Sequence, residues 1–192
     1  MPIRIADLTA HDAQSWLPDA LSVYVTAMNY PLGTEVQRAP LWHEHIQRPG
    51  WKAVGAFDSL GPASGRETLV GIAYGYSGAN DQWWNQQVRS GLVRAGSSRE
   101  RVSAITDSYF ELTELHVHPS AQGQQIGEAI LTRLLDGRDE PQVLLSTPEV
   151  DAENNRAWRL YRRLGFADVL RGFSFAGDPR PFAVLGRALP LR

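Results

Sequence analysis

The segment at residues 117–131, VHPSAQGQQIGEAIL, limits what this chain can fold into more than any other. Its apolar residues Ile126, Ile130 and Leu134 follow at i, i+4 and i+8, and the charged residues nearby fall away from that stripe. This spacing predicts a helix with one buried face, beginning near residues 124–125. Gly137 is a suitable stop. Because an apolar strand precedes it, the segment predicts a strand, a glycine-rich turn and a helix in direct succession.

The turn before this helix has two interpretations. The start of a helix presents unpaired backbone N–H groups and the positive end of the helix dipole, so a diphosphate placed there meets several donors. Gly123 and Gly127 carry no Cβ that would block a close approach. The other interpretation is a plain structural turn, and the turn taken alone does not decide between the two.

The rest of the chain predicts further strands and helices. We expect strands at residues 3–5, 51–58, 68–77, 109–118, 142–147, 166–177 and 181–189. We expect helices at residues 9–28, divided by Pro18, and at 41–47, 80–96 and 153–164. A turn is expected at residues 59–67 and an exposed loop at 97–103. In the 68–77 strand, Leu69 is expected on the face opposite Ile72 and Tyr74. Without a repeat or linker, these elements predict one α/β (α+β) domain, residues 1–192.

Composition excludes several classes of function. The 192 residues carry a net charge of −2 and no basic run, so nucleic acid is not expected as a partner. The absence of cysteine excludes disulfides and a thiol nucleophile and fits a reducing compartment. The N-terminus does not resemble a signal peptide, and no apolar run approaches the ~20 residues that span a bilayer. We therefore expect a cytoplasmic protein without a membrane partner.

A second pattern lies at residues 154–166, NNRAWRLYRRLGF. It places Leu160, Tyr161 and Leu164 on one face of a helix that ends at Gly165. Tyr161 is either a core aromatic, the commoner role for such a residue, or a group whose hydroxyl takes part in chemistry.

Together the two patterns resemble the GCN5-related N-acetyltransferases. The family pattern Arg/Gln-x-x-Gly-x-Gly/Ala corresponds to QGQQIG at residues 122–127, after Val117 and a proline. The block Asn-x-x-Ala, three residues, Tyr, three residues, Gly-Phe corresponds to Asn154, Ala157, Tyr161, Gly165 and Phe166. The match covers about residues 109–175 closely, with a helix and a strand between the blocks as in the family.

One position departs from the family. Gln125 stands where the family has its central glycine. A negative φ at Gln125 would make its Cβ tolerable. If instead the backbone must approach the phosphate closely, coenzyme A binding suffers. We expect binding to be retained but weakened.

The resemblance implies acetyl-CoA as donor, an amine of a small molecule or protein as acceptor, and no metal. It implies a mixed, mostly antiparallel central sheet flanked by helices, with residues 78–108 as an insertion between the third and fourth strands. Direct attack in a ternary complex is expected, since no cysteine can carry the acyl group. The residues it assigns to coenzyme A are Val117, Gln122, Gly123, Gln124, Gln125, Gly127, Glu128 and Asn154.

The resemblance assigns Tyr161 as the general acid for the leaving thiolate. The general base is open among Glu111, Glu114 and Glu149, with Glu111 and Glu149 preferred. Glu149 lies twelve residues before Tyr161, where some relatives carry a glutamate base. The alternative is that these carboxylates pair with arginines or face solvent.

Several features have plainer alternatives. Glu114, His116 and His118 alternate along one strand face, and His43 and His45 repeat that spacing, but surface or hydrogen-bonded histidines are favoured over a metal site. The adjacent Trp83 and Trp84 cannot both face inward on a helix; one is expected to dock the 78–108 segment and the other to line an acceptor pocket, unless both simply pack.

Two other classes of function remain as alternatives. One is a non-catalytic coenzyme A-binding regulatory or interaction domain. The other is an oligomeric scaffold built through the aromatic segment, and the resemblance is compatible with a homodimer.

Overall fold

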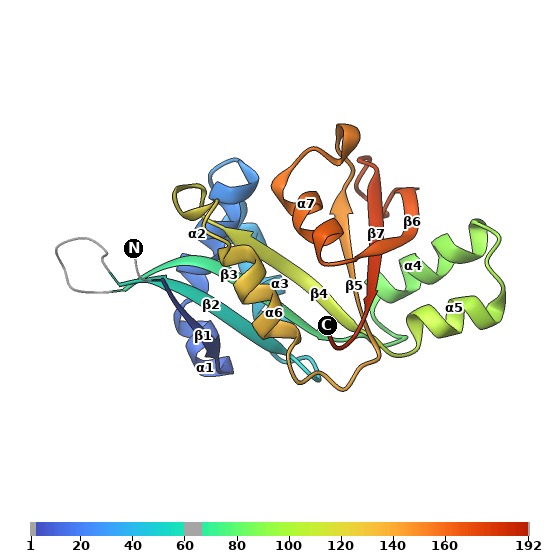
Figure 1. Cartoon of the computed structure of the whole chain (residues 1–192), viewed down its shortest axis with the longest axis horizontal. Helices are drawn as coiled ribbons and strands as arrows, with labels where there is room; N and C mark the ends of the chain where they lie inside the picture. The colour runs from blue at the N-terminus through green and yellow to red at the C-terminus, as the bar shows by residue number, and fades with distance from the viewer. Residues whose placement is uncertain (1–2, 60–66, 192) are drawn as a thin grey trace. The chain divides into compact units, whose positions relative to one another are not determined.

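The computed structural model describes residues 3–59 and 67–191, and its chain passes three times between two units (Figure 1). The N-terminal unit comprises Met1–Tyr76 and Leu112–Asp136, and the C-terminal unit comprises Ser77–Glu111 and Gly137–Arg192. The turn expected at residues 59–67 lies almost wholly outside the described residues.

The described strands form one hydrogen-bonded sheet in the order β1-β2-β3-β4-β5-β7-β6. The pairs β1–β2, β2–β3, β5–β7 and β6–β7 are antiparallel, whereas β4 and β5 run parallel from the Phe110↔Val143 pair. The predicted mixed, mostly antiparallel sheet is therefore confirmed. The strands are β1 (Ile3–Leu8), β2 (Lys52–Asp58), β3 (Thr68–Ser77), β4 (Phe110–Val117), β5 (Gln142–Pro148), β6 (Ala167–Phe173) and β7 (Phe182–Ala188).

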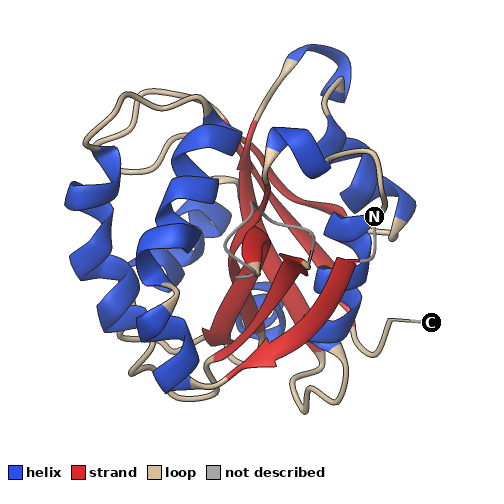
Figure 2. Ribbon diagram, turned by 90° about the vertical axis from the view of Figure 1, so that its left-hand side faces the viewer, coloured by secondary structure: helices blue, strands red, loops and turns tan. Residues whose placement is uncertain are grey.

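Helices lie against the strands in both units (Figure 2). They are α1 (Ala10–Ser15), α2 (Leu17–Met28), α3 (Thr34–His45), α4 (Trp83–Arg94), α5 (Arg99–Thr106), α6 (Ile126–Leu135) and α7 (Arg156–Arg163), with short 3-10 turns η1 (Pro119–Ala121) and η2 (Asp151–Glu153). None of the described helices is long and apolar enough to cross a membrane.

In the N-terminal unit, the break between α1 and α2 follows the sequence closely. Thr9 and Asp12 form a reciprocal capping box at the start of α1, and Pro18 lies in the first turn of α2. Buried residues of α2 and α3, including Tyr24 and Trp42, pack with residues of β1, β2 and β3 to form the core on this face of the sheet.

The opposite face of these strands receives α6, which packs on β1 and β2 (Figure 1). A Cβ on Gly71 would lie 3.3 Å from Ile126 Cγ2 and 3.2 Å from Ala56 Cβ. Glycine in β3 therefore lets the first turn of α6 come close to the sheet.

The predicted faces of β3 are wrong at one residue. Ala56 pairs with Gly71 but Phe57 pairs with Leu69, so the ladder skips a residue of β3. Leu69 consequently packs in the same core cluster as Ile72. A bulge of this kind inserts one extra residue and shifts the alternation of side chains, which strict period-2 counting does not foresee.

In the C-terminal unit, α4 and α5 pack on each other and α4 contacts β6. The exposed loop predicted at residues 97–103 is wrong, because α5 begins at Arg99. Its cap Ser98 accepts a hydrogen bond from the N–H of Arg101, and Val102 and Thr106 form its buried stripe. The helix predicted at residues 41–47 is likewise longer and starts at Thr34. Both errors fall on polar segments in which apolar periodicity is weak.

Candidate active site

The turn before α6 leaves a run of backbone donors available. Within the described part of the chain, none of the N–H groups from Gly123 to Gly127 donates a hydrogen bond. Gly123 has φ 84° and Gln125 has φ 60°, with Gln124 between them at a φ that is not positive. When the sign of φ alternates in this way, successive N–H groups point toward the same side of the chain and form an anion-binding concavity.

Gln125 adopts the left-handed conformation that the family glycine adopts without cost. It is the N-cap of α6, at φ 60° and ψ 11°, and its side chain makes no capping hydrogen bond. The condition that φ be negative is therefore not met. A Cβ in this region costs roughly 1 kcal/mol relative to glycine. The chain thus keeps the glycine-type turn at a small conformational cost, and its effect on coenzyme A affinity stays a prediction.

Several contacts hold the turn to the end of β4. The side-chain amide of Gln122 donates to the backbone oxygen of Val117 at 2.9 Å, and the N–H of His118 donates to the backbone oxygen of Val70 at 2.8 Å. His118 Nδ1 also lies 2.7 Å from Ser120 Oγ and caps η1. Gln122 and Val117, both predicted to contact coenzyme A, therefore also position the turn. Glu128 lies half-buried in the first turn of α6.

Glu114 and His116 lie on the face of β4 that α2 covers. Glu114 Oε2 is 2.5 Å from His116 Nε2. The imidazole meets the Tyr24 ring edge-on, with ring centroids 5.0 Å apart. Glu114, one of the three carboxylates predicted as candidate bases, is thus in contact with the imidazole of His116.

Glu111 and Glu149 have different environments, both in the C-terminal unit. Glu111 is only 4% exposed and pairs in register with Leu144. Glu149 Oε1 accepts hydrogen bonds from Arg171 Nε at 2.7 Å and from the N–H of Gly172 at 2.9 Å. The bond from Arg171, followed by that from Gly172, lowers the pKa of Glu149 below its usual value. A carboxylate held this way is a weak proton acceptor at neutral pH.

Tyr161 is buried in α7, 7% exposed, with its ring 5.5 Å from that of Phe166. Asn154 does not cap α7, since Asn155 holds that position, and its side-chain oxygen instead accepts from Arg159 Nη1 at 2.8 Å. An ion-pair network covers the same unit, in which Arg162 and Arg171 bind the carboxylates of Glu149, Glu153 and Asp168.

The histidines do not form a cluster of metal ligands. No group of three or more His, Cys, Asp or Glu side chains suited to a metal ion occurs in residues 3–59 and 67–191. His45 is instead buried against Tyr74, with Nδ1 3.0 Å from the phenol oxygen, and burial lowers its pKa to about 4. It is therefore a neutral, hydrogen-bonded core residue, as the plainer interpretation predicted.

The two tryptophans of α4 have different surroundings. Trp84 is half-buried and its Nε1 donates to Ser146 Oγ at 3.1 Å, whereas Trp83 is 53% exposed and lies against Phe175, ring to ring at 5.7 Å. Trp84 docks the segment. A role for either in acceptor choice stays a prediction.

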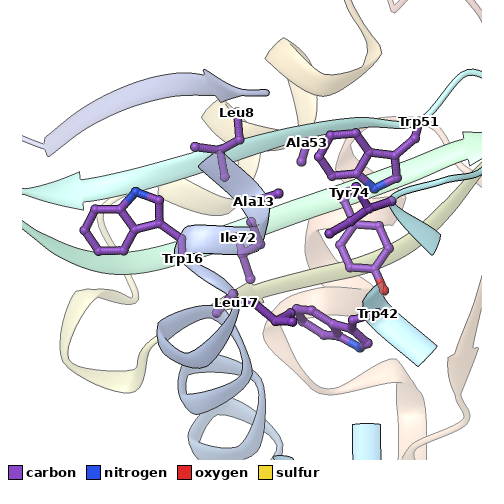
Figure 3. A pocket seen from close by; sticks show the side chains of 11 residues that line it. Leu8, Ala13, Trp16, Leu17, Trp42, Trp51, Ala53, Ile72 and Tyr74 are labelled. Atoms are coloured by element: carbon purple, nitrogen blue, oxygen red, sulfur yellow. The ribbon is translucent and has the colours of Figure 1, made fainter. Parts of the chain in front are cut away.

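An apolar pocket lies in the N-terminal unit among α1, α2, α3 and the first three strands (Figure 3). Trp16, Trp42, Trp51 and Tyr74 are the aromatic residues of its lining, which carries no carboxylate and no histidine. Proton transfer from an amine needs a base, so this pocket does not provide the chemistry.

Sequence patterns missed two residues that shape these surroundings. Tyr24 on α2 faces the Glu114–His116 pair, and nothing in its own segment indicates that partner. Trp158 is fully buried in α7 and donates from Nε1 to the backbone oxygen of Pro148 at 3.0 Å. Its position one turn before Arg162, whose guanidinium lies 5.0 Å from its ring, is the only signal the sequence offers.

Comparison with known proteins gives consistent matches. A family model described as acetyltransferase (GNAT) domain matches residues 79–168. The GCN5-like protein acetyltransferase Rv2170 of Mycobacterium tuberculosis is 55% identical over 206 aligned residues, covering 100% of each chain.

Solved structures share the fold. Arabidopsis thaliana NAA60 in complex with acetyl-CoA matches with a TM-score of 0.63 at 16% identity, over 98% of this chain and 99% of that one. The PaiA N-acetyltransferase of Thermoplasma acidophilum in complex with coenzyme A matches with a TM-score of 0.59 at 15% identity, over 98% of this chain and 100% of that one. The identity to the mycobacterial relative, sustained over both full lengths, confirms the resemblance: this chain is an acetyltransferase of the GNAT family.

Proposed function

We propose that this enzyme transfers an acetyl group from acetyl-CoA to a primary amine carried by a protein, by direct attack in a ternary complex. The observation that carries the proposal is the run of N–H groups from Gly123 to Gly127 that make no hydrogen bond within the described residues. Such donors at the start of α6 suit the diphosphate of coenzyme A. The full-length relative whose name specifies a protein acetyltransferase supports a protein acceptor.

On this proposal the turn fixes the donor through its diphosphate. Gly123, Gln124, Gln125 and Gly127 contribute backbone N–H groups, and the bond between Gln122 and Val117 holds the turn to β4. Glu128 and Asn154 are proposed as further contacts. Bound acetyl-CoA supplies a thioester carbonyl, whose developing negative charge is best met by a backbone N–H near the end of β4.

Residues of the chain must provide for two proton transfers, one from the amine and one to the leaving thiolate. A protonated amine is no nucleophile, so a base must take its proton before attack. The leaving thiolate then needs a proton, and Tyr161 is proposed as its donor from the position it holds in the family motif. Glu111, Glu114 and Glu149 are the carboxylates proposed to provide the base, directly or through a group they contact, and Glu149 is least suited because Arg171 lowers its pKa.

A turnover assay tests the proposal. The intact protein is incubated with acetyl-CoA and, separately, a lysine-containing peptide with a blocked N-terminus, a lysine-free peptide with a free N-terminus, and a polyamine. We expect thioester consumption with at least one peptide and acetylation of its amine by mass spectrometry.

Each other outcome is informative. Coenzyme A binding without turnover on any amine would favour the non-catalytic binding domain. Turnover with the polyamine alone would replace the protein acceptor by a small molecule. Tyr161→Phe serves as the matched variant and should lower kcat without changing coenzyme A affinity, since it keeps the ring that packs on Phe166.

A further inference from the structure

The face of β4 covered by α2 holds a polar pair among aromatic rings. The Glu114 and His116 side chains, in contact at 2.5 Å, are 19% and 10% exposed. Tyr24 stands against the imidazole, and Tyr30 lies against Tyr24 with ring centroids 5.3 Å apart. Both side chains are therefore mostly buried, but each keeps a small solvent-exposed surface.

Stability alone does not account for this pair. Removing a carboxylate and an imidazole from water costs free energy, and replacing such a pair by apolar residues is often neutral or stabilising. Here the imidazole meets Tyr24, which itself belongs to an apolar core cluster and packs on Trp42. Polar groups kept in such a place are candidates for function.

Tyr24 is not the proton acceptor. Burial, followed by the negative charge of Glu114, raises the pKa of Tyr24 well above its ordinary value, so the phenol stays protonated at neutral pH. The charged and titratable groups that act on Tyr24 are Glu114, Arg38 on α3 and Tyr30. The imidazole of His116 is the group beside Tyr24 that has a nitrogen able to accept a proton.

The geometry of His116 leaves one ring nitrogen available. Its Nε2 faces Glu114 Oε2, and a proton on Nε2 is donated to that carboxylate. Nδ1 makes no hydrogen bond within residues 3–59 and 67–191. It then carries a lone pair, and the carboxylate stabilises the imidazolium that forms when Nδ1 takes a proton, as in carboxylate–histidine pairs generally.

We propose that His116 Nδ1 accepts the proton of the acceptor ammonium and that Glu114 positions and charges the imidazole for this step. The proposal rests on the proposed amine acetylation and names its base. It also fits the acceptor class, because a primary ammonium is attracted both to a carboxylate and to the face of an aromatic ring such as Tyr24.

The protons and bonds of the step balance. The ammonium gives one proton to Nδ1, the neutral amine attacks the thioester carbon, a C–N bond forms and the C–S bond breaks. The second proton leaves the nitrogen as the amide forms, the thiolate takes one proton, and His116 returns its own to solvent. The net products are the acetylamide, free coenzyme A and one released proton.

The first test needs no mutation. Long-range nitrogen–proton spectra of histidine-labelled, full-length protein report which ring nitrogen carries the proton. We expect the neutral form of His116 to carry its proton on Nε2, where it is donated to Glu114. A neutral tautomer protonated on Nδ1 would overturn the proposal, since that nitrogen could then not act as acceptor.

The second test is kinetic. With an acceptor from the turnover assay, His116→Asn is expected to lower kcat about 100-fold, the usual scale for a lost general base. Added imidazole should restore part of that rate. Glu114→Gln should lower kcat less than His116→Asn does, because a neutral amide still contacts the ring but stabilises the imidazolium less than a carboxylate, and added imidazole should not restore that rate. His43→Asn, at an exposed histidine of α3 outside the pair, is the matched control with kcat nearly unchanged.

Measuring the affinity for coenzyme A distinguishes a failure of this proposal from a failure of the proposed acetyltransferase function. If His116→Asn binds coenzyme A as the unmodified protein does and kcat falls, both stand. If kcat and its pH profile are unchanged in His116→Asn, the base is another residue, while the proposed function is unaffected. If the unmodified protein acetylates no amine, the proposed function fails, and the tautomer spectrum still tests the pair.

Discussion

The starts of α6 and α7 are built in opposite ways. Asn155 caps α7 by accepting from the N–H of Trp158 at 2.9 Å. At α6, the cap residue Gln125 makes no such bond, and the N–H groups around it make none within the described residues. A helix that only needs to be stable satisfies its first donors with a side chain. The contrast supports the proposal that the α6 donors bind the diphosphate, and it gives the start of α7 no such role.

The surroundings of the two helices repeat the contrast. Near α7, Arg162 and Arg171 form ion pairs with Glu149, Glu153 and Asp168. Near the turn before α6, Gly123, Gln124 and Gln125 are exposed. Variants at these two helix starts should therefore separate ligand affinity from stability.

A carboxylate introduced beside the unbonded N–H groups at the start of α6 should have the largest effect on coenzyme A affinity. Gly127→Asp places a carboxylate in the first turn of α6, where it suits the helix dipole but occupies and repels the site of a diphosphate. We expect coenzyme A affinity to fall on the order of 100-fold, about 2.7 kcal/mol, with no loss of melting temperature. Calorimetric titration measures the first and thermal unfolding the second; unchanged affinity would remove the contrast.

Removing the α7 cap should lower stability and leave coenzyme A affinity unchanged. Asn155→Ala loses one side-chain hydrogen bond to the helix and should cost about 1 kcal/mol of unfolding free energy. Coenzyme A affinity should stay within about twofold, a range too small to reflect a lost contact. Chemical denaturation and titration of the same sample measure both quantities. A large loss of affinity in this variant would mean that α7 holds the ligand after all.

The ion pairs near α7 should contribute little to the free energy of unfolding. Arg171→Met should lower stability by less than about 1 kcal/mol, because the pairs are largely exposed and screened. It should also raise the pKa of Glu149 toward its ordinary value, which carboxyl carbon NMR detects. Since the folded pKa is lowered, the contribution of the pair is present above the unfolded pKa and is lost as pH falls through the folded pKa. A pKa that does not move would show that Arg171 is not its cause.

Restoring the family glycine should have the smallest effect. Gln125→Gly removes a Cβ from a left-handed residue, so we expect a gain in coenzyme A affinity of no more than a few-fold. Titration against the unmodified protein measures it. A fall in affinity would show that the glutamine side chain contributes a contact of its own rather than a compromise.

The sequence predicted the parts of the fold that depend on local periodicity. The α6 stripe of Ile126, Ile130 and Leu134 is buried as expected, and Thr9 with Asp12 forms the predicted cap. Local patterns did not reveal the bulge that moves Leu69 to the other face of β3, because a bulge depends on pairing with β2. They also missed α5, whose polar sequence supports a helix only once Val102 and Thr106 find a core.

The candidate site divides in the same way. The glycine-rich turn was predictable because its chemistry lies in the backbone over a few consecutive residues. The left-handed conformation of Gln125 was not, since glutamine rarely adopts it without tertiary constraint. The partner of His116 was within reach as an alternating residue of one strand, but Tyr24 comes from a distant helix and could be placed only by the fold.

Amide chemical shifts of the turn test the central claim most directly. In a nitrogen–proton spectrum of the full-length protein titrated with coenzyme A, the N–H groups of Gly123 to Gly127 should shift together and saturably, and pantetheine, which lacks the diphosphate, should leave them unmoved. Saturable binding of coenzyme A that moves other amides but not these would contradict the account.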